Sequence, residues 1–142
     1  MPETLVQKLI KRACITLDEN SSIKNLVDTL NKNKVGCVVV TSLKSNYPVG
    51  IVSERDLVRN FKDILNNNTI KVKDVMTKNI IFCNKNTSSK ELMEIMSKNK
   101  IRHIPIIEKN KLLGIVSIGD VVKRIIENYA YETKHLREYI NS

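Results

Sequence analysis

The sequence contains few of the residues on which several common kinds of site depend. Its 142 residues include four glycines, two phenylalanines, four tyrosines and no tryptophan. Neither G-x-G-x-x-G nor G-x-x-x-x-G-K-[ST] occurs, so no glycine-rich loop of the Rossmann or P-loop kind is present to bind a phosphate. Any phosphate would have to be bound by cationic side chains instead. The scarcity of aromatic rings also removes the surfaces on which single-stranded nucleic acid stacks.

Metal-binding and nucleophilic side chains are equally scarce. Cys14, Cys37 and Cys83 are far apart, form no C-x-x-C pair and have no histidine at metal-ligand spacing. Cys37 and Cys83 lie in apolar stretches, where a free thiol usually packs as a small core residue. We therefore expect no disulfide and no metal site. His103 and His135 have no partner nucleophile in the sequence, so we also expect no catalytic residue, no catalytic cofactor and no enzymatic activity.

Long apolar runs are absent as well. No N-terminal run of the signal-peptide kind occurs, and every apolar stretch is far short of the ~20 residues that span a bilayer. With the unpaired cysteines, this predicts a cytoplasmic protein that has no membrane segment. The net charge of +9 favours anionic partners, although lysines scattered among many Asn and Ile residues are also what an AT-rich coding sequence produces.

The most informative feature of the sequence is an internal repeat. Apolar residues follow helical spacing from Ile23 to Leu30, and three of the four recur 66 positions later, between Ser89 and Met96. Residues of the N-cap type precede both segments. Nearly continuous apolar runs follow each helix, as expected of short strands covered on both faces. The elements expected in the two copies are a leading strand (14–17; 80–83), the helix, two strands (35–41 and 49–53; 101–107 and 113–117) and a closing helix (57–65; 121–129).

This order predicts an α/β (α+β) fold made of two β-α-β-β-α repeats. A unit of about 50 residues buries little surface alone, so the two repeats should pack on each other with pseudo-two-fold symmetry. The expected boundaries are an N-terminal helix at 1–12, a first repeat at 13–66, a linker at 67–77, a second repeat at 78–131 and a charged helical or frayed tail at 132–142.

Two similar phrases lie where the last strand of each copy meets the closing helix. They read Gly-Ile-Val-Ser-Glu-Arg-Asp at 50–56 and Gly-Ile-Val-Ser-Ile-Gly-Asp at 114–120. They resemble the G-h-h-[ST]-x-x-D signature of CBS (cystathionine-β-synthase) domains, and the segments 74–77 and 102–106 add to the likeness. The resemblance implies a stand-alone CBS pair that is a homodimer and binds AMP, ADP, ATP or NAD in clefts between its repeats. Such a module would signal to an unknown partner protein by changing its conformation or dimer state.

The repeated serines and aspartates are the first candidate ligand-binding residues. The carboxylates of Asp56 and Asp120 would accept hydrogen bonds from the ribose hydroxyls, because a carboxylate is an acceptor with two oxygens and suits a vicinal diol. Ser53 and Ser117, with the exposed helix N-termini, would face the phosphate. Of the two aspartates, Asp120 is the favoured one. The alternative is structural, since S-x-x-[DE] at a helix start is also a capping sequence.

The other candidates would hold phosphate and adenine. Arg55, Arg102 and His103 would bind the phosphate, with an ordinary surface charge as the alternative for Arg55 and a structural role as the alternative for His103. The residues expected to line an adenine slot, if they are not simply core, are Ile80, Ile81, Ile104 and Pro105. Residues 36–39 replace Arg102 to Pro105 in the first copy and lack two cationic donors, so the two clefts should be unequal.

Two other functions stay open at this point. One is a basic nucleic-acid-binding module, which the few aromatic residues and the dispersed lysines disfavour. The other is a ligand-free scaffold that dimerises and binds a protein. We also expect a homodimer, because one thin module would leave apolar side chains such as Leu30 and Met96 uncovered.

Overall fold

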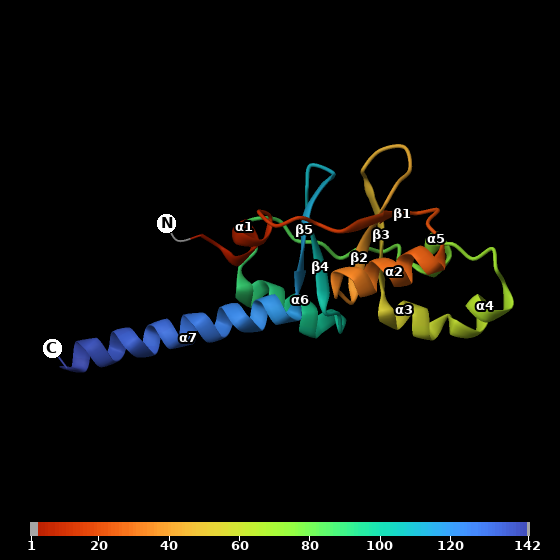
Figure 1. The fold of residues 1–142 in the computed structure, drawn as a ribbon. Coiled ribbons are helices and arrows are strands. Elements are labelled where there is room, and N and C mark those ends of the chain that lie inside the picture. The colour runs from red at the N-terminus through yellow and green to blue at the C-terminus, as the bar shows by residue number, and fades with distance from the viewer. Residues whose placement is uncertain (1–2, 142) are drawn as a thin grey trace.

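The computed structural model describes residues 3–141, and in them two similar units lie side by side (Figure 1). Each unit has a first helix, two antiparallel strands and a closing helical segment, which is two helices in the first unit and one in the second. The first consists of β1 (Thr16–Asp18), α2 (Ile23–Asn33), β2 (Cys37–Thr41), β3 (Pro48–Ser53), α3 (Glu54–Arg59) and α4 (Phe61–Asn66). The second consists of α6 (Ser89–Asn99), β4 (His103–Glu108), β5 (Lys111–Ser117) and α7 (Ile118–Asn141). The predicted fold class and repeat are confirmed.

The first helix of each unit begins and ends for the same local reasons. The Ser22 hydroxyl accepts a hydrogen bond from the backbone N–H of Asn25 at 3.0 Å, and Ser88 accepts one from Glu91 at 3.1 Å. Both helices end at a lysine in the left-handed conformation, Lys34 or Lys100. The buried leucines of these helices then pack on their own strands. The sequence pattern and the caps therefore determine these two helices locally.

The two sheets differ in one strand. In the first, β1 pairs parallel with β2, which pairs antiparallel with β3. In the second, β4 and β5 are antiparallel and the leading strand predicted at 80–83 is wrong, because only Cys83 pairs, through a parallel bridge to Ile106. The preceding chain is held elsewhere: Thr77 exchanges two backbone hydrogen bonds with Ile51 of β3.

A short helix before each unit packs into the core of the other unit. Val6 and Leu9 of α1 (Leu5–Leu9) are buried with the second unit, and Val72 and Val75 of α5 (Val72–Val75) are buried with the first. The N-terminal helix is thus shorter than the expected span of 1–12, and the stretch 67–77 contains a packed helix. A side chain at Gly50 would place its Cβ 2.5 Å from the Met76 sulfur, so glycine permits this crossing.

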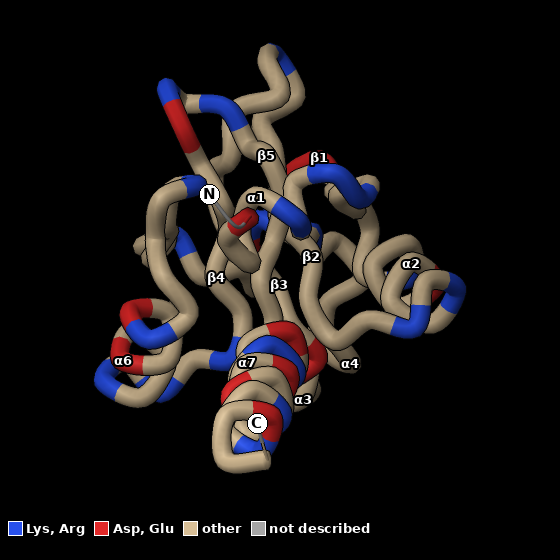
Figure 2. Tube along the Cα trace, turned by 90° about the vertical axis from the view of Figure 1, so that its left-hand side faces the viewer, with Lys and Arg blue, Asp and Glu red and all other residues tan. Residues whose placement is uncertain are grey.

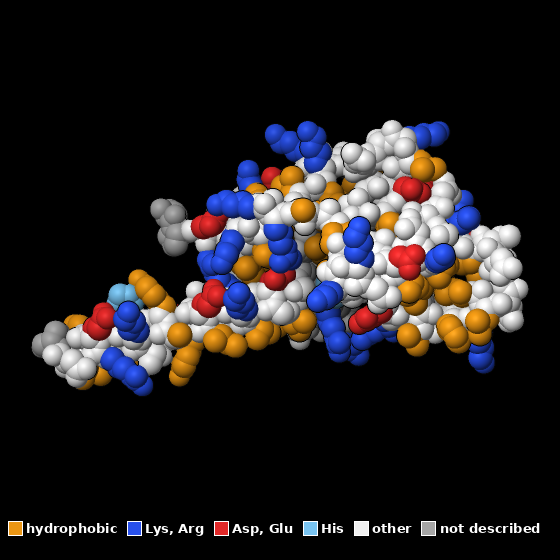
Figure 3. Space-filling model, viewed as in Figure 1, with side chains coloured by type: hydrophobic (Ala, Val, Ile, Leu, Met, Phe, Trp, Pro, Cys, Tyr) orange, Lys and Arg blue, Asp and Glu red, His pale blue; other side chains and the backbone are white. Residues whose placement is uncertain are grey.

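The closing helices lie together on one side of the sheets, while α2 and α6 lie on the two outer sides (Figure 2). Apolar side chains gather along this lower edge (Figure 3). Phe61 is 57% exposed and Ile125, at the matching position of the second unit, is 42% exposed. The expectation that Leu30 and Met96 are uncovered is wrong, because each is buried in the core of its own unit. The apolar surface belongs to the closing helices.

The C-terminal half of α7 extends beyond the body of the molecule (Figure 1). The expected tail at 132–142 is helical as far as Asn141, and Ser142 lies outside the described residues. No helix within 3–141 is both long enough and apolar enough to span a membrane.

Candidate functional site

A cleft of about 510 Å³ lies between the two units. Its walls come from the end of β3, the start of α3, the segment after α5 and the start of β4. The sequence-predicted residues that line it are Ser53, Arg55, Asp56, Ile81, Arg102, His103 and Pro105. A larger, open hollow lies along the exposed end of α7 and contains none of the predicted residues.

Four predicted residues do not line this cleft. Ile104 has no exposed surface and belongs to the core of the second unit, because alternate residues of β4 face opposite sides. Ile80 is partly buried beside the cleft-lining Ile81. Ser117 ends β5 and Asp120 lies in the first turn of α7, and neither is part of the lining. The favoured aspartate is therefore not in the same cleft as Arg102 and His103.

Asp56 both caps a helix and faces the cleft. Its Oδ2 accepts hydrogen bonds from the Ser53 backbone N–H at 2.8 Å and from the Ser53 hydroxyl at 3.2 Å. Its Oδ1 has no hydrogen-bond partner within residues 3–141. Capping and ligand binding are thus compatible, because Oδ2 serves the cap and Oδ1 is available to a ligand.

Four cationic side chains surround the same cleft, namely Arg55, Arg59, Lys100 and Arg102. No hydrogen bond or ion pair joins any of these side chains to another described residue. Glu54 and Asp56 are the acidic residues of the lining, so the cationic groups outnumber them. The arrangement favours an anionic group over a neutral one.

Sequence reasoning missed Arg59 and Lys100. Arg59 is one helical turn after Arg55 on α3, so the spacing alone could have indicated that both reach the same side. Lys100 reaches the cleft because it ends α6 in the left-handed conformation, which redirects the chain into β4. Only the packing of the two units brings these side chains together.

His103 and Cys37 line the cleft in their neutral forms. Burial lowers the pKa of His103, and this outweighs the nearby Asp120 and Glu54 carboxylates, which raise it. Burial, with the charge of Asp56, raises the pKa of the Cys37 thiol to about 12. A protonated thiol is a poor nucleophile, so Cys37 contributes surface to the cleft rather than reactivity.

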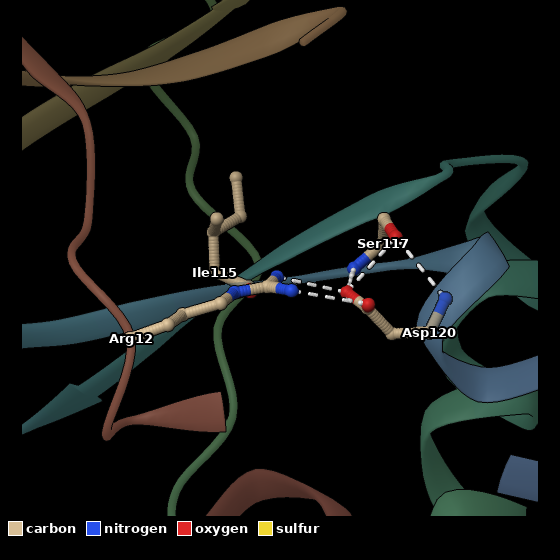
Figure 4. Close-up of polar contacts among 4 residues, drawn as sticks. All are labelled: Arg12, Ile115, Ser117 and Asp120. Atoms are coloured by element: carbon tan, nitrogen blue, oxygen red, sulfur yellow. Dashed lines mark hydrogen bonds and ion pairs between the residues drawn. The ribbon is translucent and has the colours of Figure 1, made fainter. Parts of the chain in front are cut away.

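Asp120 is bound by an arginine from the other end of the chain (Figure 4). Nη1 of Arg12 donates to Oδ1 at 3.2 Å and Nη2 donates to Oδ2 at 2.9 Å, while Ser117 donates its N–H and its hydroxyl to Oδ2, each at 2.9 Å. Burial by itself raises the pKa of Asp120, but the hydrogen bonds from Arg12 and Ser117 and the charge of Arg12 lower it below its usual value. Both carboxylate oxygens therefore already have partners.

Comparison with known families finds one match, the CBS domain, at residues 6–63 and again at 72–127. The mitochondrial CBS domain-containing protein CBSX3 of Arabidopsis thaliana is 33% identical over 133 residues, which are 89% of this chain and 62% of that protein. An uncharacterized protein of Methanocaldococcus jannaschii is 27% identical over 140 residues, which are 96% of this chain and 49% of that protein. The chain thus spans less than two thirds of the length of these relatives.

Solved structures show the same fold. The crystal structure of a CBS-domain containing protein from Agrobacterium tumefaciens superposes with a TM-score of 0.77 at 37% identity, covering 87% of this chain and 93% of that one. A CBS domain protein from Pyrobaculum aerophilum, complexed with AMP, superposes with a TM-score of 0.73 at 29% identity, covering 84% and 89%. The arrangement of the two units is therefore one that known proteins share.

Proposed function

The chain belongs to the CBS domain family, and we propose that it is a regulatory module that binds an adenine nucleotide in the cleft between its two repeats. The observation that carries this proposal is the lining of the cleft. One wall presents a carboxylate with an open oxygen, Asp56, and the surrounding walls present four cationic side chains that have no partner in the described structure. This combination suits a molecule that carries both a sugar diol and a phosphate.

Asp56, rather than Asp120, would hold the ribose. Its open Oδ1 can accept hydrogen bonds from the hydroxyls of the sugar, while its Oδ2 stays with Ser53. The bonds to Ser53 also fix the carboxylate, so little side-chain freedom is lost on binding. The corresponding position in the second repeat has no such open oxygen.

The cationic side chains would hold the phosphate from both repeats. Arg55 and Arg59 come from α3 of the first repeat, whereas Lys100 and Arg102 come from the segment between α6 and β4 of the second. Arginine binds phosphate oxygens in a planar, bidentate manner, and each such bond is strengthened by charge. Neutral His103 adds one N–H donor or one acceptor.

The adenine ring would contact the apolar part of the lining, beyond the ribose from the phosphate. Ile51, Ile81 and Pro105 line the cleft together with the neutral thiol of Cys37. Small-molecule sites typically combine such apolar walls with a few polar groups. The relative from Pyrobaculum aerophilum, which is complexed with AMP, supports a nucleotide of this class, and AMP, ADP, ATP and NAD all fit the description.

Binding would act as a signal because the site spans two separate cores. The first repeat packs around Leu26 and Val52, and the second around Leu92 and Val116. Helix α5 completes the core of the first repeat, and helix α1 completes the core of the second. A nucleotide held by Asp56 on one side and Arg102 on the other favours one relative position of the repeats. A partner protein that distinguishes the two positions would then respond to the nucleotide.

A homodimer would form through the closing helices. Val58, Phe61 and Leu65 of the first repeat and Val122, Ile125 and Tyr129 of the second are exposed at matching positions. The pseudo-two-fold arrangement makes this surface similar at its two ends, which suits pairing with a second copy. Dimerisation would connect the signal to the assembly of the protein.

The test is titration of the full chain with AMP, ADP, ATP and NAD by calorimetry, together with thermal shifts. A nucleotide at 100 times its Kd is expected to stabilise the protein by about 2.7 kcal/mol. Absence of heat and of any shift for all four would reject the proposal and leave the ligand-free scaffold. Retention on DNA that vanishes as salt is raised, with no response to nucleotides, would instead support the nucleic-acid-binding alternative.

A further inference from the structure

The two Ser-x-x-Asp sites are equivalent in the repeat but differ in what contacts the aspartate. Asp56 keeps one oxygen without a partner in residues 3–141, whereas Asp120 has a guanidinium nitrogen of Arg12 on each oxygen (Figure 4). Nη2 of Arg12 also donates to the carbonyl of Ile115 at 2.9 Å. The planar fork of Arg12 therefore takes up the acceptors that a sugar diol would need.

The segment that carries Arg12 is attached to the second repeat. Val6 and Leu9, a few residues earlier, are buried in the core of that repeat. The hydroxyl of Thr4 donates to the carbonyl of Lys85 at 3.1 Å, and the guanidinium of Arg124 donates to the carbonyl of Glu3. Arg12 is thus brought to Asp120 by a packed helix rather than by a free chain end.

The first repeat provides an internal comparison. Val72 and Val75 stand 66 residues after Val6 and Leu9 and are buried to the same extent, so the residue that corresponds to Arg12 is Lys78. Lys78 is exposed, and its side chain makes no hydrogen bond or ion pair in the described part of the chain. A lysine has no planar fork, and Asp56 is left open. The residue type at one position thus distinguishes the two sites.

We propose that Arg12 occupies the second ribose position from within, so that the chain binds one adenine nucleotide, at Asp56, and that removal of the guanidinium opens a second site at Asp120. This inference rests on the proposed function of the first cleft. Without Arg12, Asp120 would keep the hydrogen bonds of Ser117 on its Oδ2, as Asp56 keeps those of Ser53, and its Oδ1 would be open.

The experiment is calorimetric titration of the full chain with AMP. The wild-type protein is expected to bind one AMP per chain, and Arg12→Ala and Arg12→Gln are each expected to bind two. Lys78→Ala is the matched control and is expected to bind one. A wild-type protein that binds two, or Arg12 variants that still bind one, would overturn the inference. Melting curves establish that each variant is folded.

A second set of variants separates this inference from the proposed function. The double variant Arg12→Ala, Asp56→Ala is expected to bind one AMP, and adding Asp120→Ala is expected to abolish it. Binding by this double variant with none by the wild-type protein would reject the first cleft and retain the role of Arg12. Binding by the wild-type protein with none by the double variant would reject the role of Arg12 alone. No binding by any variant would reject both.

Discussion

Replacing Asp56 by asparagine separates the two roles that this side chain combines. The Oδ2 atom accepts a hydrogen bond from the Ser53 backbone N–H at 2.8 Å, and Oδ1 of this cleft-lining residue has no hydrogen-bond partner in the described structure. In Asp56→Asn the amide oxygen can still accept from Ser53. The amide NH₂ then takes the place of Oδ1, and it donates where a ribose hydroxyl needs an acceptor.

The expected loss is one charge-assisted hydrogen bond to the ligand, about 1.5–3 kcal/mol. At ~1.4 kcal/mol for each factor of ten, the affinity for AMP should fall by about ten- to a hundredfold. The melting temperature should stay close to that of the wild-type protein because the cap is preserved. Asp56→Ala should lose the same affinity and, in addition, about 0.5–2 kcal/mol of stability with the cap.

Calorimetric titration with AMP and a melting curve on the same preparations measure both effects. Asp74 supplies a matched control, because its carboxylate accepts the Lys71 backbone N–H at 2.8 Å in the same kind of cap but does not line the cleft. Asp74→Ala is expected to lower the melting temperature and leave the affinity unchanged. If Asp56→Asn bound AMP as tightly as the wild-type protein, the ribose assignment would be refuted and Asp56 would be only a cap.

Three further predictions concern charge, assembly and pH. Arg102→Ala should lower the affinity for AMP more than the affinity for adenosine, because only AMP carries the phosphate. Equal losses of affinity in titrations with both ligands would show that the phosphate lies elsewhere. The wild-type chain should be a dimer by light scattering and Phe61→Ser with Ile125→Ser a monomer, since both side chains lie on the exposed apolar edge; a monomeric wild-type protein at micromolar concentration would contradict this. The pKa of Asp120 in the folded chain is below its ordinary 3.8, so its bonds stabilise the fold above that pH and are lost as the pH falls through the folded-state pKa. Asp120→Asn should therefore melt at a lower temperature than the wild-type protein near neutral pH, and this difference in melting temperature should shrink in strong acid. Scanning calorimetry that found the same difference in melting temperature in strong acid would disprove this.

Local sequence was enough to predict most of the elements. The helices α2 and α6 follow from apolar spacing and a serine cap, both of which involve residues within a few positions of one another. The strand pairs follow from short apolar runs, and the doubled Ser-x-x-Asp phrase indicates two equivalent positions at helix starts. The candidate residues Arg55, Asp56, Arg102 and His103 were also identified from the sequence.

Features that depend on distant residues were missed. At the strand predicted at 80–83 only Cys83 pairs, with Ile106, while Thr77 before it pairs with Ile51 of β3. The prediction that Leu30 and Met96 are uncovered was wrong because each repeat covers its own helix. The two phrases contain the same serine and aspartate, so they do not indicate which aspartate keeps a carboxylate oxygen without a hydrogen-bond partner. Arg12 is 108 residues from Asp120 in the sequence, and only the packing of α1 on the second repeat brings its guanidinium to that carboxylate.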